Sequence, residues 1–379
     1  MKILLTGGGT GGPTTPLLAM IQAWRKKEPN LEVTFWGTTE GPEREWVEAM
    51  GIRFQTIVSG KWRRYVSVKN FFDLVNIVQA FFIAVGRLLH DRPDLMISAG
   101  SFVSVPVAWA CAMLGIPVAI HQQDVRPGLA NRLMAPVATL ITTTFTTSLH
   151  HFPKSKTVLA GNPVRADLLE GAAERATERF DLRSDFPTIL ILGGGTGSLA
   201  LNKIVMDALP KLLPRMQVIH VAGRGKNIFQ HPLFHETHRP TSFDLLDSTV
   251  KQKSLIQRYH VVEFLTEEMK DVLAVATVVV TRAGMATLSE LAALKKATVI
   301  IPLPQSHQEP NADYFQKHGA AVVLNQHTLT AQIFTQHLLA LLDQPKLRGS
   351  LEDQIGRIMK PDAAEHIVEL LEEQLAKKR

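Results

Sequence analysis

The chain has 379 residues, which is enough for two domains that each bury a core of their own. Its 45% hydrophobic and 20% charged residues are typical of a globular protein, and its formal net charge of +6 favours anionic partners: phosphates, nucleic acid or an acidic membrane surface. The single cysteine, Cys111, excludes an intramolecular disulfide and a cysteine-cluster metal site, as expected in a reducing cytosol.

Short apolar runs alternate with helix-length segments along the whole chain, which predicts βαβ units and parallel sheets with helices on both faces. We expect an α/β protein with an N-terminal domain (1–163), a C-terminal domain (164–355) and an amphipathic helix (356–379) that packs back on the N-terminal domain. The predicted strands are residues 2–6, 32–36, 53–57, 94–98, 117–121, 139–143 and 156–160, then 188–192, 217–221, 260–264, 277–281, 297–301 and 320–324.

Nearly the same sequence opens both halves. Residues 3–11 read ILLTGGGTG and residues 189–197 read ILILGGGTG. A buried strand that runs into a glycine turn and then a helix can present free backbone N–H groups to an anion, although a tight turn without a ligand has the same pattern. Pro13 stands where a P-loop has its lysine, which argues against a P-loop NTPase, and Glu40 keeps a dinucleotide-dependent oxidoreductase as an alternative.

A second signal lies in residues 61–89, which mix basic and aromatic side chains and contain no acidic residue before Asp73. Nucleic-acid binding is one interpretation, because cations meet phosphates and rings stack on bases. A helix on an anionic membrane is another, and a buried helix behind a basic loop is the third. Phenylalanine dominates the rings and no RNA-binding motif accompanies them, so we place the membrane before nucleic acid. Residues 102–120 are uncharged, but Pro106, Gly115 and Pro117 divide them into a buried helix and a strand rather than a membrane span.

Two further segments follow predicted strands, at the sheet edge where α/β proteins bind ligands. In His121-Gln122-Gln123-Asp124, the imidazole and the carboxylate could act as acid and base, or the histidine could simply pack. In residues 281–290, Thr287 and Glu290 have the spacing of a capping box. The same helix start could instead face a diphosphate, with Glu290 accepting hydrogen bonds from ribose hydroxyls.

Taken in order, these residues resemble the MurG family over essentially the whole chain. The resemblance rests on GGTGG at 8–12, GSFVSVP at 100–106, HQQD at 121–124 with PGLAN at 127–131, GNPVR at 161–165, the glycine loop at 193–198, EFL at 263–265, residues 282–290, and His307-Gln308 with Asn311-Ala312.

The resemblance implies two Rossmann-like domains that face a cleft, the fold called GT-B, with the acceptor on the N-terminal domain and the nucleotide sugar mainly on the C-terminal one. It also implies transfer of N-acetylglucosamine from UDP-N-acetylglucosamine (UDP-GlcNAc) to undecaprenyl-diphospho-muramoyl-pentapeptide in peptidoglycan synthesis. Members are peripheral proteins on the cytoplasmic face of the cell membrane, so residues 61–89 are expected to bind an anionic membrane surface. No cofactor, metal or nucleic acid is expected.

The resemblance also assigns substrate-binding roles. The backbone of Leu265 is expected at the uracil and Glu290 at the ribose, with Gln308 and Asn311 at the sugar. The diphosphate is expected among Gly195, Thr196, Gly197, Met285, Ala286, Thr287, Leu288 and Ser289. The first loop, Thr10, Gly11 and Gly12, is expected with Arg165 near the donor and acceptor phosphates.

The chain departs from the family at two positions that bear on catalysis. Pro13 replaces the usual histidine after the first glycine loop, and HQQD at 121–124 replaces His-Glu-x-Asn. Because the attacking sugar hydroxyl must lose a proton, we expect Asp124 to be the base, oriented or assisted by His121. The alternatives are a relative that acts on another lipid-linked acceptor and a nucleotide-sugar-binding protein without catalysis.

Overall fold

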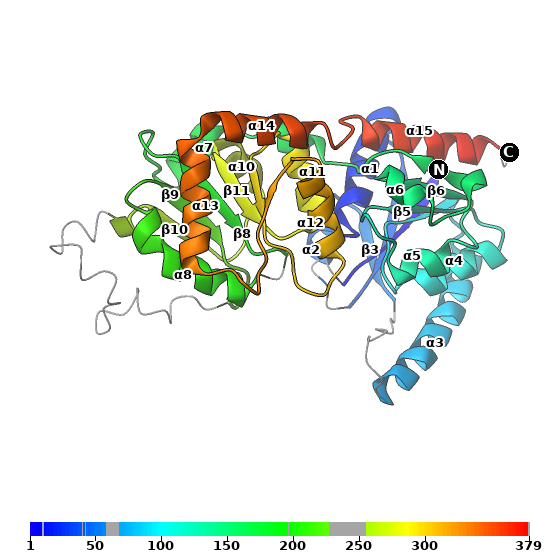
Figure 1. The fold of residues 1–379 in the computed structure, drawn as a ribbon. Coiled ribbons are helices and arrows are strands. Elements are labelled where there is room, and N and C mark those ends of the chain that lie inside the picture. Colours follow the sequence, from blue (N-terminus) through cyan, green and yellow to red (C-terminus); the bar gives the residue numbers. More distant parts are fainter. Residues whose placement is uncertain are drawn as a thin grey trace. The chain divides into compact units, whose positions relative to one another are not determined.

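The computed structural model describes residues 1–9, 11–39, 41, 43–57, 68–195, 197–226 and 255–377, with the side chains of 68–75 excepted. It divides into two compact units (Figure 1). Unit 1 comprises Met1–Ala166 and Met359–Arg379, and unit 2 comprises Asp167–Ile358.

The described part of unit 1 is built on a seven-stranded parallel sheet with the order β3-β2-β1-β4-β5-β6-β7. The strands are apolar on both faces because helices cover both, as in other parallel sheets. They are β1 (Lys2–Thr6), β2 (Glu32–Gly37), β3 (Arg53–Thr56), β4 (Leu95–Ser98), β5 (Val118–Gln122), β6 (Leu140–Thr143) and β7 (Thr157–Leu159).

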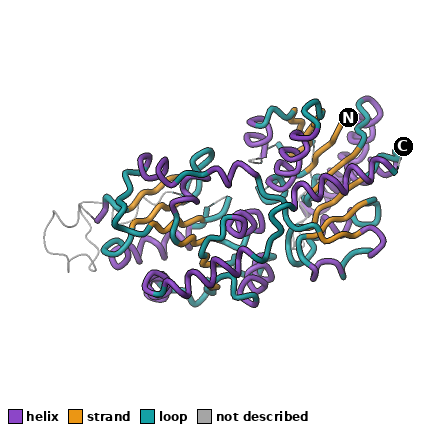
Figure 2. The backbone as a smooth tube through the Cα atoms, turned by 90° about the horizontal axis from the view of Figure 1, so that it is seen from above, coloured by secondary structure: helices purple, strands orange, loops and turns teal. Residues whose placement is uncertain are grey.

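Two groups of helices cover the two faces of this sheet (Figure 2). On one face, α1 and the C-terminal helix α15 pack over Ile3, Leu5 and Phe35, and on the other α3 and α4 pack over Leu4, Met96 and Ile120. The helices of unit 1 are α1 (Thr15–Lys27), α2 (Glu43–Ala49), α3 (Val68–His90), α4 (Ser104–Met113), α5 (Leu129–Met134), α6 (Thr146–Leu149) and α15 (Ala363–Ala376), with the 3₁₀ turns η1 (Lys154–Lys156) and η2 (Ala166–Glu170), the latter reaching into unit 2.

Unit 2 repeats the architecture with a six-stranded parallel sheet in its described part, in the order β10-β9-β8-β11-β12-β13. Helices α8 and α13 pack over Ile189, Ile191 and Val280 on one face. The strands are β8 (Thr188–Leu192), β9 (Gln217–Val221), β10 (Tyr259–Val262), β11 (Val278–Thr281), β12 (Thr298–Ile300) and β13 (Val322–Val323). The helices are α7 (Ala173–Arg179), α8 (Leu199–Leu212), α10 (Met269–Val275), α11 (Met285–Ala293), α12 (Gln308–Lys317), α13 (Ala331–Asp343) and α14 (Pro345–Gly356).

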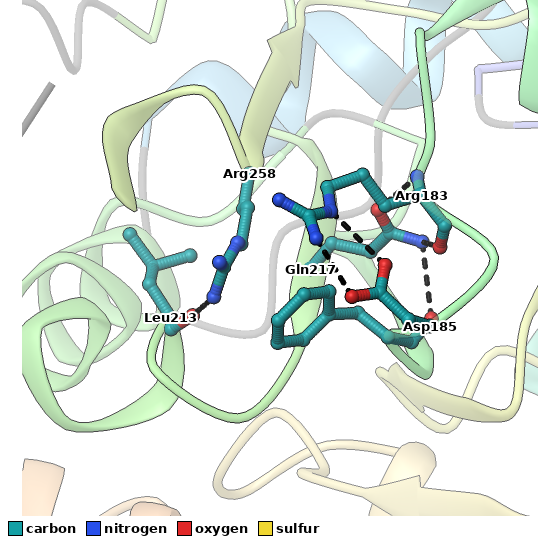
Figure 3. A network of polar contacts seen from close by, with 6 residues as sticks. Arg183, Asp185, Leu213, Gln217 and Arg258 are labelled. Atoms are coloured by element: carbon teal, nitrogen blue, oxygen red, sulfur yellow. Dashed lines mark hydrogen bonds and ion pairs between the residues drawn. The ribbon is translucent and has the colours of Figure 1, made fainter. Parts of the chain in front are cut away.

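A polar network closes the amino-terminal edge of the unit 2 sheet, away from the glycine loop (Figure 3). The buried amide of Gln217 accepts a hydrogen bond from the Arg183 backbone N–H at 2.9 Å and donates to the Arg183 and Phe186 carbonyls. The Arg258 guanidinium lies 3.6 Å from the centroid of the Phe186 ring, a cation–π contact, and Arg183 pairs with Asp185. The network holds residues 183–186, directly before β8 begins.

The predicted α/β fold class and all thirteen predicted strands are confirmed, each within about two residues at either end. Residues 102–120 form α4 and then β5, as predicted, and no helix among the described residues is long and apolar enough to cross a membrane. The amphipathic C-terminal segment forms α15, which packs on α1 in the core of unit 1 through Ile367, Val368 and Leu371.

Candidate functional site

Each sheet reverses its strand order at one point, and a glycine loop follows the strand at that point. In unit 1, β1 lies between β2 and β4, and in unit 2, β8 lies between β9 and β11. The connections from the two central strands then leave in opposite directions, which opens a crevice at their carboxyl ends where α/β proteins bind ligands. The glycine turns after β1 and β8 therefore occupy the expected ligand-binding position in both units.

The first glycine loop is held between two neighbouring segments of unit 1. Gly8 and Gly9 have φ of +137° and +83°, values that favour glycine. The Gly9 N–H donates to Glu43 Oε2 at 3.3 Å, and the Gly8 carbonyl accepts from Ser101 Oγ at 3.0 Å. A methyl group on Gly11 would overlap the ring of Trp46, so α2 also packs directly against the loop. Thr10 and Glu40 lie outside the described residues.

The segment after β5 is organised by side chains that bind its backbone. Gln122 Nε2 donates to the Asp124 carbonyl at 2.8 Å, and Asn131 Nδ2 donates to Gln122 Oε1 at 2.7 Å. Ser148 Oγ donates to the Val125 carbonyl at 3.0 Å. These bonds leave Asp124 half-buried at the ligand-binding edge of the sheet. Its position is compatible with the predicted role as a base, which stays a prediction.

His121 is buried and bonded on both ring nitrogens. Nε2 lies 2.8 Å from Asn162 Oδ1, and Nδ1 lies 2.9 Å from Thr142 Oγ1. An amide oxygen only accepts, so Nε2 carries the proton and Nδ1 accepts from the threonine hydroxyl. Burial lowers the pKa of His121 to about 4, although the Asn162 hydrogen bond opposes the shift. The neutral imidazole thus links β5 to β6 and to the turn at Asn162, and its bonds run to these residues rather than to Asp124.

The second glycine loop surrounds a buried cation. Gly194 and Gly197 have φ of +85° and +70°, and a side chain on Gly197 would overlap the Ala222 carbonyl. Ser198 caps α8, where its Oγ accepts from the Leu201 N–H at 3.3 Å. Arg282 is only 6% exposed, and its guanidinium donates to Ser198 Oγ and to the Ile301 carbonyl. Burial lowers the Arg282 pKa from its ordinary value, but an arginine keeps its charge.

Helix α11 begins at Met285 with Gly284 as its N-cap. Thr287 therefore lies inside the first turn and cannot be the N-cap, so the capping-box alternative is wrong. The side chains of Met285, Leu288 and Ser289 are buried. Ala286, Thr287 and Glu290 are half-buried, so the start of α11 combines backbone N–H groups with a hydroxyl in the first turn and a carboxylate in the second.

Gln308 and Asn311, at the start of α12, hold the loop that leads into α11. Gln308 Oε1 accepts from the Ala283 N–H at 3.3 Å and from the Leu303 N–H at 2.9 Å. Asn311 is fully buried and donates to the Ala283 carbonyl at 3.1 Å. Both residues position the candidate donor site, and their predicted contact with the sugar stays a prediction.

Leu265 lies just beyond β10, beside the turn that follows β9. The Gly223 N–H donates to the Glu263 carbonyl at 3.1 Å, and the Gly225 N–H donates to Glu263 Oε1 at 3.3 Å. The Leu265 side chain is buried. Of the remaining predicted residues, Gly11, Gly12, Arg165 and Gly197 are half-buried, Gly195 is exposed, and Thr196 lies outside the described residues.

Unit 1 also carries exposed apolar side chains on three neighbouring helices, α3, α4 and α5. The Trp109 indole N–H donates to the Leu133 carbonyl and so links α4 to α5. Of the predicted membrane segment 61–89, residues 61–67 and the side chains of 68–75 lie outside the described residues, and Arg87 donates to the Thr56 carbonyl instead of facing outward. The exposed large apolar side chains of these three helices, called the apolar patch below, are Val78, Phe82, Leu89, Trp109, Met113, Leu129 and Leu133.

Comparison with known proteins decides the family. The model of the glycosyltransferase family 28 N-terminal domain matches residues 3–143, and that of the C-terminal domain matches residues 188–367. A relative from Lachnoclostridium phytofermentans, named UDP-N-acetylglucosamine--N-acetylmuramyl-(pentapeptide) pyrophosphoryl-undecaprenol N-acetylglucosamine transferase, is 35% identical over 98% of both chains. One of the same name from Lachnospira eligens is 37% identical over 94% of this chain and 97% of its own.

The chain belongs to the MurG family.

Solved structures agree on the fold. The crystal structure of Acinetobacter baumannii MurG superposes with a TM-score of 0.70 at 24% identity, covering 98% of this chain and 99% of that one. A UDP-GlcNAc 2-epimerase from Neisseria meningitidis, bound to UDP-GlcNAc, superposes with a TM-score of 0.69 at 15% identity, over 98% and 100% of the two chains. The two parallel-sheet α/β units give this MurG-family chain the predicted GT-B fold class.

Sequence reasoning did not single out four residues that organise these loops: Glu43, Ser101, Ser198 and Arg282 as a donor to Ser198. Each bonds to a residue distant in the sequence or in a different loop, and the spacing along the chain carries no signal of such a contact. The only hint was the glycine turn itself, which requires neighbours that satisfy its backbone.

We predict that unit 1 loses stability in acid because of His121. Its folded pKa of about 4 lies below the unfolded value of 6.5, so the unfolded chain binds the proton first. The free energy of unfolding should fall as the pH drops from 6.5 to 4, with about 3 kcal/mol from this group. All five tryptophans lie in unit 1, so urea titrations followed by tryptophan fluorescence report on it.

The control is His121→Asn, which cannot titrate and should show a smaller pH slope over this window even if it is less stable at pH 7. An equal slope in the variant would contradict the assignment.

Proposed function

We propose that the chain transfers N-acetylglucosamine from UDP-GlcNAc to undecaprenyl-diphospho-N-acetylmuramoyl-pentapeptide, a step of peptidoglycan synthesis. The observation that carries the proposal is the 35% identity, over 98% of both chains, to a relative named for this reaction. The glycine loops at the strand-order reversals of both units support it, because donor and acceptor each carry a diphosphate.

We assign the donor to unit 2. The first turns of α8 and α11 carry backbone N–H groups that have no partner in the helix ladder, together with the positive ends of two helix dipoles. Arg282 adds a buried positive charge beside the same glycine loop. These groups would offset the charge that develops on the UDP leaving group when the bond to the sugar breaks. Glu290, which lies in α11, would accept hydrogen bonds from the ribose hydroxyls.

We assign the acceptor to unit 1 and the role of base to Asp124. The acceptor hydroxyl attacks the anomeric carbon and must lose its proton as it does so. Asp124 follows the carboxyl end of β5 and is half-buried, so it combines access to a ligand with partial exclusion of water. His121 would position the start of this segment through its bonds to Thr142 and Asn162.

The apolar patch on α3, α4 and α5 is the proposed membrane contact. Phe82 is 67% exposed and Leu89 is 69% exposed, while Arg92 and Arg132 on the neighbouring surface are exposed cations. Apolar side chains flanked by cations suit the boundary between acyl chains and anionic headgroups. A peripheral position would bring unit 1 to an acceptor anchored in the bilayer.

The transfer assay tests the function directly. We expect the purified chain to move N-acetylglucosamine from radiolabelled UDP-GlcNAc to the lipid-linked muramoyl-pentapeptide, and UDP-GlcNAc to raise its melting temperature. A thermal shift without transfer would point to a binding protein, and transfer only to another lipid-linked sugar would reassign the acceptor.

The second prediction concerns the base. Asp124→Asn should lower kcat by about 100-fold or more, the range of general base catalysis, while leaving the UDP-GlcNAc thermal shift unchanged. Asp353→Asn is the matched control, since Asp353 is an exposed carboxylate on α14. Near-normal turnover of Asp124→Asn would refute the assignment.

The third prediction concerns the membrane. Phe82→Ser should weaken binding to vesicles of phosphatidylglycerol and phosphatidylethanolamine by about 10- to 150-fold, because burying a phenylalanine contributes roughly 1.5–3 kcal/mol. Leu347→Ser, at an exposed apolar position of unit 2, should bind as the wild type does. Equal vesicle binding by Phe82→Ser and the wild type, measured by co-sedimentation, would argue against this patch.

A further inference from the structure

One peptide group of the first glycine loop is held at both of its polar ends. The Gly8 carbonyl accepts a hydrogen bond from Ser101 Oγ at 3.0 Å, and the N–H of the same peptide, on Gly9, donates to Glu43 Oε2 at 3.3 Å. Ser101 follows β4 and Glu43 begins α2, so the two partners approach from segments on either side of β1. The orientation of this peptide plane is therefore set by side chains outside the loop.

Glu43 is built into the protein more firmly than an ordinary surface carboxylate. It is completely buried, and its second oxygen, Oε1, accepts from the Thr38 N–H at 2.9 Å and from the Thr38 hydroxyl. A methyl group on Gly8 would overlap this carboxylate, so the glycine is required for the close approach. Burying a carboxylate is costly unless several donors satisfy it, and here they come from two different loops.

Ser101 shows a second sign that this arrangement is specific. Its φ of +116° lies in a region that residues with a side chain rarely adopt, because the Cβ atom is crowded there. The surrounding structure holds the residue in that conformation, and its hydroxyl reaches the Gly8 carbonyl from there. A glycine would adopt the same backbone conformation without strain but could not donate this hydrogen bond.

We propose that Glu43 and Ser101 are positioning residues that fix the Gly8–Gly9 peptide and thereby hold the first glycine loop ready for the acceptor diphosphate. The proposal rests on the proposed function. Neither side chain needs to touch the substrate. Their task is to keep this peptide plane in one orientation, with its carbonyl oxygen toward Ser101 and its N–H toward Glu43, so that the rest of the loop keeps one conformation.

The charge of Glu43 explains why only one orientation is stable. If the peptide turned over, its carbonyl oxygen would point at the carboxylate and its N–H at the serine hydroxyl. Two negatively polarised oxygens would then face each other in a buried site, where electrostatic repulsion is strong. A carboxylate can only accept, so it selects the N–H. A glutamine amide can both donate and accept, so it would tolerate either orientation.

The decisive experiment is Glu43→Gln. The substitution keeps the shape of the side chain but removes its preference for the peptide N–H over the carbonyl oxygen. We expect kcat/KM for the lipid-linked muramoyl acceptor to fall by about 10- to 100-fold, the size of effect that misplacement of a reactant by about 1 Å produces. The dissociation constant for UDP-GlcNAc should not change, since the donor loop belongs to unit 2. Glu48→Gln makes the same chemical change at an exposed position of the same helix and should retain wild-type kinetics.

Two substitutions of Ser101 separate the hydrogen bond from the strain. Ser101→Ala removes the hydroxyl and keeps the backbone strain, whereas Ser101→Gly removes the hydroxyl and the strain. Both should lower kcat/KM for the acceptor, and Ser101→Gly should melt at a higher temperature than Ser101→Ala. Wild-type acceptor kinetics in Ser101→Gly or in Glu43→Gln would overturn the proposal, as would an equal loss of UDP-GlcNAc affinity in either variant.

A readout without substrate separates the positioning role from the enzymatic function. Hydrogen exchange of the peptide that contains the Gly9 amide should be faster in Glu43→Gln than in the wild type and unchanged in Glu48→Gln. A wild-type chain without transfer activity would contradict the proposed function. Active wild-type protein with unchanged exchange and kinetics in Glu43→Gln would contradict only the positioning role.

Discussion

The constraint on which both units depend is the reversal of strand order in a parallel sheet. Where the order reverses, the loops after two adjacent strands leave toward opposite faces, and neither covers the crevice between them. The glycine turns after β1 and β8 are placed there by topology alone, and they lead into α1 and α8. Side chains from other segments then hold these turns in place.

The side chains that hold the turns come from other segments of each unit. Glu43 and Ser101 bind the turn of unit 1, and Arg282 reaches the N-cap of α8 in unit 2. Gln308 adds a further bond to the start of α11. A glycine-rich backbone has more conformational freedom than any other, so a preorganised anion site made of glycine needs such external bonds.

Much of the fold followed from the sequence because its signal is local. Each buried strand is a short apolar run bounded by turn residues, and the family motifs lie directly after these runs. The organisation of the site did not follow. Glu43 reads as one of several acidic residues on a short helix, and His121 gives no sign in the sequence that Asn162 and Thr142 occupy its nitrogens. The apolar patch unites Phe82, Trp109 and Leu133, which no periodicity connects.

The same glycine-rich sequence has thus acquired opposite electrostatic surroundings in the two units. In unit 1 a buried carboxylate, Glu43, contacts the loop, and in unit 2 a buried guanidinium, Arg282, lies against it. The two loops also differ in backbone conformation, because φ is positive at Gly8 and Gly9 in unit 1 and at Gly194 and Gly197 in unit 2. Under the proposed assignment, the guanidinium lies on the side of the donor, whose diphosphate gains negative charge as it leaves, and the carboxylate lies on the side of the acceptor, where its part is to hold the loop.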